Sequence, residues 1–190
     1  MPHLYTLQLL DPWQKPEAVL KSLGKKCSST MAAALKCRGS LTTHLEAQFQ
    51  QMVEVQLINQ EHNLDWEDNP TLWSQQHTWA SKKAVTMRNV WLQVGGENIL
   101  FAHSQLALNS LTTPTSQAIK EGKLPLGSLL LQSENAIERQ LLEITQAVIP
   151  DLAVEIGCDQ KKVFWCRRSL FLVNGAVSAR ILEVFLANFE

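Results

Sequence analysis

The stretch Val85-Thr-Met-Arg-Asn-Val-Trp-Leu-Gln-Val94 carries apolar side chains at two-residue spacing, which is typical of a β-strand with a buried face. Gly95 and Gly96 follow it, and glycine readily adopts the positive φ angles that a tight hairpin turn requires. A second strand pattern runs from Asn98 to about Leu108. The sequence therefore predicts an antiparallel hairpin at the centre of the chain.

Two charged residues occupy positions where this alternation predicts a buried side chain. Arg88 lies two residues before Val90 on its strand, and Glu183 lies two residues after Ile181 on a later strand. Burial of an ionised group is very unfavourable unless the group meets an opposite charge or a polar ligand. The pattern is compatible with two arrangements, a small polar pocket inside the sheet and a structural ion pair between Arg88 and Glu183.

The rest of the chain predicts further strands and several helices. Asn174-Gly175 favours a second hairpin turn, between strands 163–173 and 176–186, and shorter strands are expected at 49–57 and 128–132. A long loop is expected from 59 to 83. Capping residues, glycine stops and apolar periodicity predict helices over 16–23, 29–35, 40–48, 113–122 and 134–148.

We therefore predict an α+β fold, an antiparallel sheet of about six strands with helices on one side. It forms a single domain over residues 1–190, with a helical part over about 1–48 and a sheet part over about 49–190.

The composition excludes several classes of protein. The 190 residues are 45% hydrophobic and carry a formal net charge of −1, as in ordinary soluble globular proteins. No basic run offers a surface for nucleic acid, and no apolar run reaches the roughly 20 residues of a membrane span. The N-terminus lacks the basic start and apolar core of a signal peptide. We expect a cytoplasmic monomer with no nucleic-acid partner and no membrane insertion.

The familiar metal and cofactor motifs are absent from the sequence. The four cysteines include no C-x-x-C pair, which favours reduced thiols, although four cysteines in a secreted chain could form disulfides. The five histidines do not fall at metal-ligand spacing, and no phosphate-binding loop, dinucleotide fingerprint or nucleophile elbow occurs. Acidic residues at 65–68 are more typical of a solvated loop than of a cation site. We expect no metal and no organic cofactor.

Several short motifs, in order along the chain, resemble those of the bacterial chorismate lyase family. Its members carry an S-M-T segment at the start of a helix, an arginine strand, a T-P-L-G turn, an R-x-F-I-E-I stretch, a W-G-R-R-S strand and a T-E-L-F-L strand. The similar stretches here are 40–42, Val85–Val94, Lys123–Gly127, Arg139–Ile144, Trp165–Ser169 and Leu182–Leu186. The resemblance runs from about residue 38 to the C-terminus.

The resemblance implies a cofactor-independent lyase that converts chorismate to 4-hydroxybenzoate and pyruvate, the first step of ubiquinone biosynthesis in many bacteria. It implies that Arg88 pairs with the ring carboxylate of the substrate, helped by the backbone amides of Leu41 and Leu126. It also implies that Glu183 contacts the ring hydroxyl at the far end. An apolar setting would raise the pKa of Glu183 and favour a role as the base that removes the ring proton.

Three departures from the family pattern stand out. His103 matches the position of a family arginine that is thought to serve the enolpyruvyl carboxylate, so it is an uncertain substrate-binding residue. Leu41 replaces a methionine, and extra residues separate Ile144 from Phe164.

The alternative is a non-catalytic domain of the same fold that binds an aromatic acid, as the effector domains of some bacterial transcription regulators bind small molecules. The first 40 residues contain no basic winged-helix module.

Overall fold

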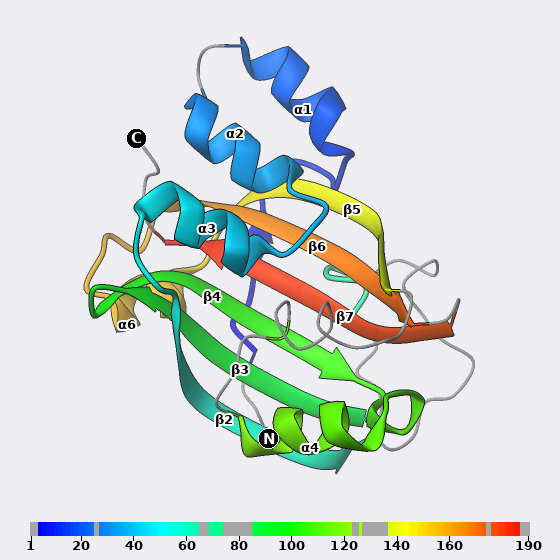
Figure 1. Cartoon of the computed structure of the whole chain (residues 1–190). Coiled ribbons are helices and arrows are strands. Elements are labelled where there is room, and N and C mark those ends of the chain that lie inside the picture. Colours follow the sequence, from blue (N-terminus) through cyan, green and yellow to red (C-terminus); the bar gives the residue numbers. More distant parts are fainter. Residues whose placement is uncertain are drawn as a thin grey trace.

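The computed structural model describes residues 4–24, 27–64, 69–73, 85–122, 126, 137–173 and 176–186. In this part of the chain one sheet has seven strands in the order β1-β5-β6-β7-β4-β3-β2, and all neighbouring strands are antiparallel (Figure 1). The strands are β1 (Gln8–Leu9), β2 (Glu54–Leu64), β3 (Val85–Val94), β4 (Glu97–Leu106), β5 (Ile137–Val148), β6 (Val163–Val173) and β7 (Ala176–Phe185). The predicted α+β class with an antiparallel sheet is confirmed.

Most of the helices lie over one face of the sheet. They are α1 (Pro16–Leu23), α2 (Ser29–Lys36), α3 (Leu41–Phe49), the short 3-10 helix η3 (Leu108–Ser110), α4 (Thr113–Glu121) and α6 (Pro150–Glu155). Figure 1 shows α2 and α3 above β4, β6 and β7. The six-residue α6 differs, because its Leu152 and Ala153 join the apolar cluster on the opposite face. The helices predicted over 16–23, 29–35, 40–48 and 113–122 are confirmed.

Capping explains where the helices of the N-terminal part begin. The Ser28 hydroxyl accepts a hydrogen bond from the backbone N–H of Met31, and the Ser40 hydroxyl accepts one from Thr43. These are N-cap contacts, which satisfy a donor that the helix itself leaves unpaired. The cap at Ser40 fixes the start of α3, whose first two residues, Leu41 and Thr42, are buried.

Each face of the sheet has its own core. The face under α2 and α3, here called the cavity face, carries Val90, Leu92 and Phe185 among its buried residues. The opposite face carries residues such as Trp91 and Phe101. This division follows from the two-residue period of a strand, which sends successive side chains to opposite faces.

Both predicted hairpins are present. Gly95 and Gly96 have φ angles of 58° and 84°, and two positive φ values in succession are the signature of a type I′ turn between β3 and β4. Val173 pairs with Ala176, so β6 and β7 form the second hairpin. Its turn residues, Asn174 and Gly175, lie outside the described residues.

The helix predicted over 134–148 is wrong from residue 137 onward, where the structure has strand β5. A bulge explains the error: Gln140 pairs with Leu170 and Glu143 pairs with Arg168, so β5 has one more residue than β6 between these pairs. Leu141, inside the bulge, has a φ angle of +47°. The extra residue breaks the two-residue alternation of a strand, and the remaining apolar spacing is then similar to that of a helix.

The first long strand also differs from its prediction. α3 continues to Phe49 and β2 runs over 54–64, so the strand predicted at 49–57 begins later and extends further. The strand predicted at 128–132 lies outside the described residues. None of the helices in the described ranges has the length and apolar character needed to cross a membrane.

Candidate functional site

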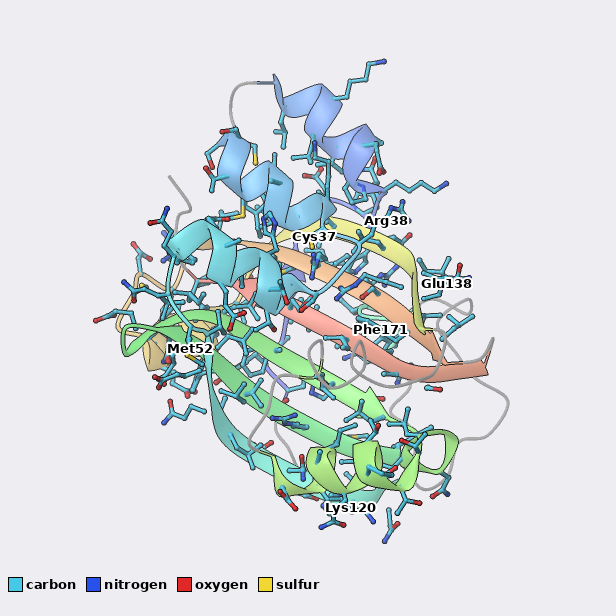
Figure 2. All side chains as sticks on the ribbon, viewed as in Figure 1. Cys37, Arg38, Met52, Lys120, Glu138 and Phe171 are labelled. Carbon is cyan, nitrogen blue, oxygen red and sulfur yellow. The ribbon has the colours of Figure 1, made fainter. Side chains whose placement is uncertain are left out.

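A cavity lies between α3 and the cavity face of the sheet. Its walls are mainly apolar, but three charged side chains reach it, from β3, β5 and β7. Side chains fill the surrounding space, among them Phe171 (Figure 2). The cavity encloses about 40 Å³ and is lined by Leu41, Thr42, Val55, Arg88, Val90, Leu92, Ala102, Ser104, Leu126, Arg139, Phe171, Ile181 and Glu183.

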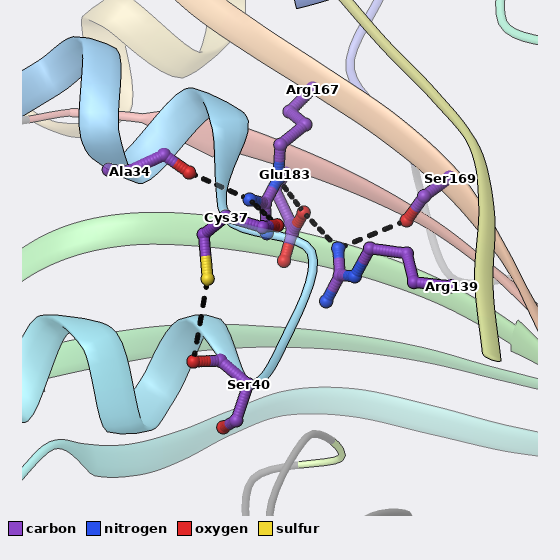
Figure 3. Close-up of polar contacts among 7 residues, drawn as sticks. All are labelled: Ala34, Cys37, Ser40, Arg139, Arg167, Ser169 and Glu183. Carbon is purple, nitrogen blue, oxygen red and sulfur yellow. Dashed lines mark hydrogen bonds and ion pairs between the residues drawn. The ribbon is translucent and has the colours of Figure 1, made fainter. Parts of the chain in front are cut away.

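Glu183 lies on the central strand β7 and forms ion pairs with two arginines. Its Oε2 atom is 2.6 Å from Arg167 Nε and 3.4 Å from Arg139 Nη1 (Figure 3). The hypothesis of a structural ion pair between Arg88 and Glu183 is therefore wrong, because the partners of Glu183 are two other cations. Glu183 nevertheless shares the cavity with Arg88.

The environment of Glu183 controls its ionisation. Burial raises the pKa of this carboxyl, but the charges and hydrogen bonds of Arg167 and Arg139 outweigh that effect, so its pKa lies below the ordinary value. The sequence-based expectation of a raised pKa is thus corrected. Glu183 is an ionised carboxylate at neutral pH, suited to accept a hydrogen bond from a hydroxyl group.

Arg88 reaches the cavity from β3 with 1% of its surface exposed. Its Nη2 donates to the carbonyl oxygen of Gly122, at 2.8 Å. Gly122 ends α4 with a φ angle of 73°, and a cation beside the C-terminus of a helix is favoured by the helix dipole. Burial lowers the pKa of Arg88 to about 10, so its guanidinium stays charged at neutral pH.

The N-terminus of α3 forms one wall of the cavity. Leu41 and Thr42 are the first two residues of this helix and line the cavity, as does Leu126. The first N–H groups of a helix have no acceptor within it and favour an anion. The structure thus brings together four of the residues that the sequence singled out: Arg88, Leu41, Leu126 and Glu183.

His103 is not at the cavity. It follows Ala102 and precedes Ser104, which both line the cavity, so alternation sends His103 to the opposite face. There its Nδ1 donates to Asn89 Oδ1 at 2.7 Å, and its Nε2 accepts from Gln105 Nε2 at 3.0 Å. Burial and the charge of Arg180 lower its pKa to about 3. The prediction that His103 contacts substrate is therefore corrected: it is a neutral core histidine.

Sequence reasoning missed two arginines of this site. Arg139 and Arg167 belong to motifs quoted for the resemblance, but neither was assigned a role. Arg167 faces the cavity side of β6, whereas the adjacent Arg168 faces away and pairs with Glu143. The two-residue alternation of 163–173 could have identified Arg167. Arg139 could not be identified in this way, because the bulge interrupts the alternation of β5.

Arg167 also holds the helices above the cavity. Its Nη1 donates to the carbonyl oxygens of Ala34 at 2.8 Å and Cys37 at 3.1 Å (Figure 3). These carbonyls lie at the end of α2 and in the segment that leads into α3. One buried guanidinium therefore connects Glu183 to the helical covering of the cavity.

The family model described as "Chorismate pyruvate-lyase Rv2949c-like" matches residues 35–190. The chain belongs to this family. The match includes all the residues of the cavity. Within the described ranges, no group of three or more His, Cys, Asp or Glu side chains is placed to hold a metal ion.

Two curated relatives carry the name "Probable chorismate pyruvate-lyase". The protein from Psychromonas ingrahamii is 27% identical over 112 residues, which cover 57% of this chain and 59% of the relative. The protein from Pseudomonas syringae pv. tomato is 35% identical over 103 residues, which cover 53% of this chain and 51% of the relative. The matched region thus spans little more than half of each relative's length.

Solved structures with a similar fold include bacterial regulators. PhnF from Mycobacterium smegmatis has a TM-score of 0.61 and 13% identity, covering 94% of this chain and 88% of that chain. A GntR-family transcriptional regulator from Enterococcus faecalis has a TM-score of 0.54 and 10% identity, covering 72% and 96%. At such low identity the likeness concerns the fold alone.

Proposed function

We propose that the protein is a chorismate pyruvate-lyase that converts chorismate to 4-hydroxybenzoate and pyruvate without a metal or an organic cofactor. Membership of the family supports this reaction. The observation that carries the proposal is the convergence of Arg88 and Glu183 on one cavity beneath the N-terminus of α3. As part of the same proposal, the protein acts as a cytoplasmic monomer at the first step of ubiquinone synthesis.

The cavity offers complementary groups for an aromatic acid. The guanidinium of Arg88 binds the ring carboxylate, a pairing that suits the planar fork of arginine. Backbone N–H groups of Leu41 and Leu126 add to that site. Glu183, on another strand of the sheet, accepts a hydrogen bond from the ring hydroxyl. The apolar walls, such as Val90 and Ile181, enclose the ring.

The chemistry requires the enolpyruvyl ether bond to break and a ring proton to leave. The ring becomes aromatic, and the departing enolate takes up a proton to give pyruvate. The protein contributes by holding a reactive conformer and by stabilising the negative charge on the leaving group. The lowered pKa of Glu183 makes it a weak base, so its main role is to orient the hydroxyl.

The cavity is smaller than its proposed ligand. Its volume of about 40 Å³ is well below the roughly 150 Å³ of an engineered apolar cavity that binds benzene. An aromatic acid therefore enters only if lining residues separate. The bonds from Arg167 to Ala34 and Cys37 are contacts that such a movement would strain or break.

Incubation of the purified protein with chorismate tests the proposal, with 4-hydroxybenzoate and pyruvate followed by chromatography. We expect equimolar formation of both products above the spontaneous rate. Glu183→Gln should lose most of this activity, whereas Arg168→Gln, which changes a buried arginine on the opposite face, should keep it. A folded wild-type protein without turnover would refute the lyase.

The alternative is a non-catalytic domain that binds an aromatic acid. The observation that favours it is the similarity in fold to PhnF, which covers 94% of this chain. Such a protein would be stabilised by 4-hydroxybenzoate through mass action but would not consume chorismate. A ligand-induced thermal shift combined with the absence of products would support this alternative.

A further inference from the structure

Arg139 is a second buried cation of the cavity, and it approaches from the side opposite Arg88. It lies on β5, four strands from β3 in the order β5-β6-β7-β4-β3, with Glu183 on β7 between them. Its side chain is 3% exposed and lines the cavity. Burial, followed by the charge of Arg167, lowers its pKa to about 10, so it is charged at neutral pH.

The guanidinium of Arg139 is held in place but incompletely paired. It lies 4.3 Å from the centre of the Phe171 ring, and its Nη1 donates to Ser169 Oγ at 3.1 Å. Its contact with Glu183 is the longer of the two ion pairs, at 3.4 Å against 2.6 Å for Arg167. Among the described residues, Arg139 Nε has no hydrogen-bond partner.

The charges around Glu183 do not balance. Arg139 and Arg167 share the single atom Oε2, so two buried cations meet one carboxylate. Arg167 is the closer partner and also donates to two carbonyl oxygens, and although its Nη2 has no hydrogen-bond partner among the described residues, Arg167 does not line the cavity, whereas Arg139 does. Arg139 retains a donor and a positive charge for a ligand. A buried cation of this kind favours an anionic partner.

We propose that Arg139 binds a second carboxylate of the ligand and makes the cavity selective for diacids over monoacids. This inference rests on the proposed function and assigns the enolpyruvyl carboxylate to Arg139. In chorismate the ring hydroxyl and the enolpyruvyl ether stand on adjacent carbons, so their protein partners should be neighbours. Glu183 and Arg139 are neighbours, with 3.4 Å between Oε2 and Nη1. His103 cannot take this role, because it lies on the opposite face of the sheet.

The bulge in β5 provides this placement. Arg139 and Ile144 are five residues apart, so an unbroken strand would send them to opposite faces. The extra residue at Leu141 brings both to the cavity side, where Ile144 joins the core and Arg139 the cavity. A strained backbone at a non-glycine residue is thus associated with the orientation of a ligand-binding side chain.

Two unreactive probes test the proposal by titration calorimetry. 3-(Carboxymethoxy)benzoate carries a ring carboxylate and a second acid on an ether, and 3-methoxybenzoate lacks the second acid. We expect wild type to prefer the diacid by about tenfold or more. Arg139→Gln should abolish this preference and leave monoacid affinity within about twofold, whereas Arg88→Gln should weaken both probes. Arg139→Lys, which keeps the charge, should retain part of the preference.

Every result bears on the proposal. Equal loss of affinity for both probes in a folded Arg139→Gln protein would mean that Arg139 has a structural role only. An Arg139→Gln protein that keeps the wild-type preference for the diacid would overturn the proposal. So would a wild-type protein that binds neither probe or binds both equally. Because the probes do not react, a protein that lacks turnover but shows the Arg139-dependent preference would refute the lyase alone. Turnover without that preference would refute the role of Arg139 alone.

Discussion

Arg167 and Glu183 face each other at a paired position of β6 and β7, with 2.6 Å between Arg167 Nε and Glu183 Oε2. The same guanidinium donates to the carbonyl oxygens of Ala34 and Cys37. Glu183, which we propose contacts the ligand, therefore also orients Arg167, the residue that binds the end of α2. Events at Glu183 and the position of the helices above it are physically coupled.

The first prediction concerns this coupling. Arg167→Met should lower the free energy of unfolding by up to about 3–5 kcal/mol, because Glu183 remains buried after losing its closer partner. Glu183→Gln should remove part of that penalty, so the double variant should be more stable than the two single effects predict. Denaturant unfolding of all four proteins gives the coupling energy. Additivity within about 0.5 kcal/mol would show that the pair is not coupled.

The second prediction concerns Arg88. Arg88→Met should weaken 4-hydroxybenzoate binding by about 2–5 kcal/mol, the usual effect of removing one partner of a buried charge pair. Calorimetry on the folded variant measures it. Arg168→Met is the matched control, since Arg168 is a buried arginine stacked on Trp13 away from the cavity. Equal affinities for wild type and Arg88→Met would contradict the assigned role.

The third prediction is a pH dependence that originates at His103. Its pKa is lowered from the ordinary 6.5 to about 3 in the folded protein. Between these values the unfolded chain binds more protons than the folded one, so the free energy of unfolding falls as the pH falls from about 6.5 toward 3. His103→Gln lacks this contribution. Urea unfolding at pH 7 and pH 4 should therefore show a smaller loss in the variant, and identical losses would exclude a buried neutral histidine.

The fourth prediction concerns the bulge. Leu141→Gly should retain or slightly increase stability, because glycine adopts a φ angle of +47° without the penalty of a Cβ atom. Leu142→Gly, the matched control at a residue only 4% exposed, should lose at least about 2 kcal/mol as a buried side chain is removed. Denaturant midpoints compare the two variants. A loss at Leu141 as large as that at Leu142 would show that its side chain, not its backbone, matters.

Alternation alone located much of the candidate site. The two-residue period placed Arg88 and Glu183 on inward faces, and both line the cavity. The two-residue period is set by the geometry of the extended chain, so it is present in any regular strand. The two hairpins were predictable because glycine-containing two-residue turns are typical of them.

The failures have physical causes of their own. β5 resembled a helix because the bulge at Leu141 interrupts its alternation, and that error concealed Arg139. His103 was assigned by matching motif positions, but the register of β4 directs it to the opposite face. The partners of Glu183 were not predictable, since Arg139 and Arg167 are distant from it in sequence and meet it only through the pairing of β5, β6 and β7.

The position of β7 has a consequence for how the protein is made. In the described sheet, β7 is the strand that joins the group β2-β3-β4 to the group β1-β5-β6. We therefore expect that the two groups of strands cannot join in one sheet during synthesis until residues 176–185 are available. Fragments that end before residue 176 should expose unpaired edges of β4 and β6, which are prone to aggregate. Assembly of the cavity is thus a late event, completed by the strand that carries Glu183.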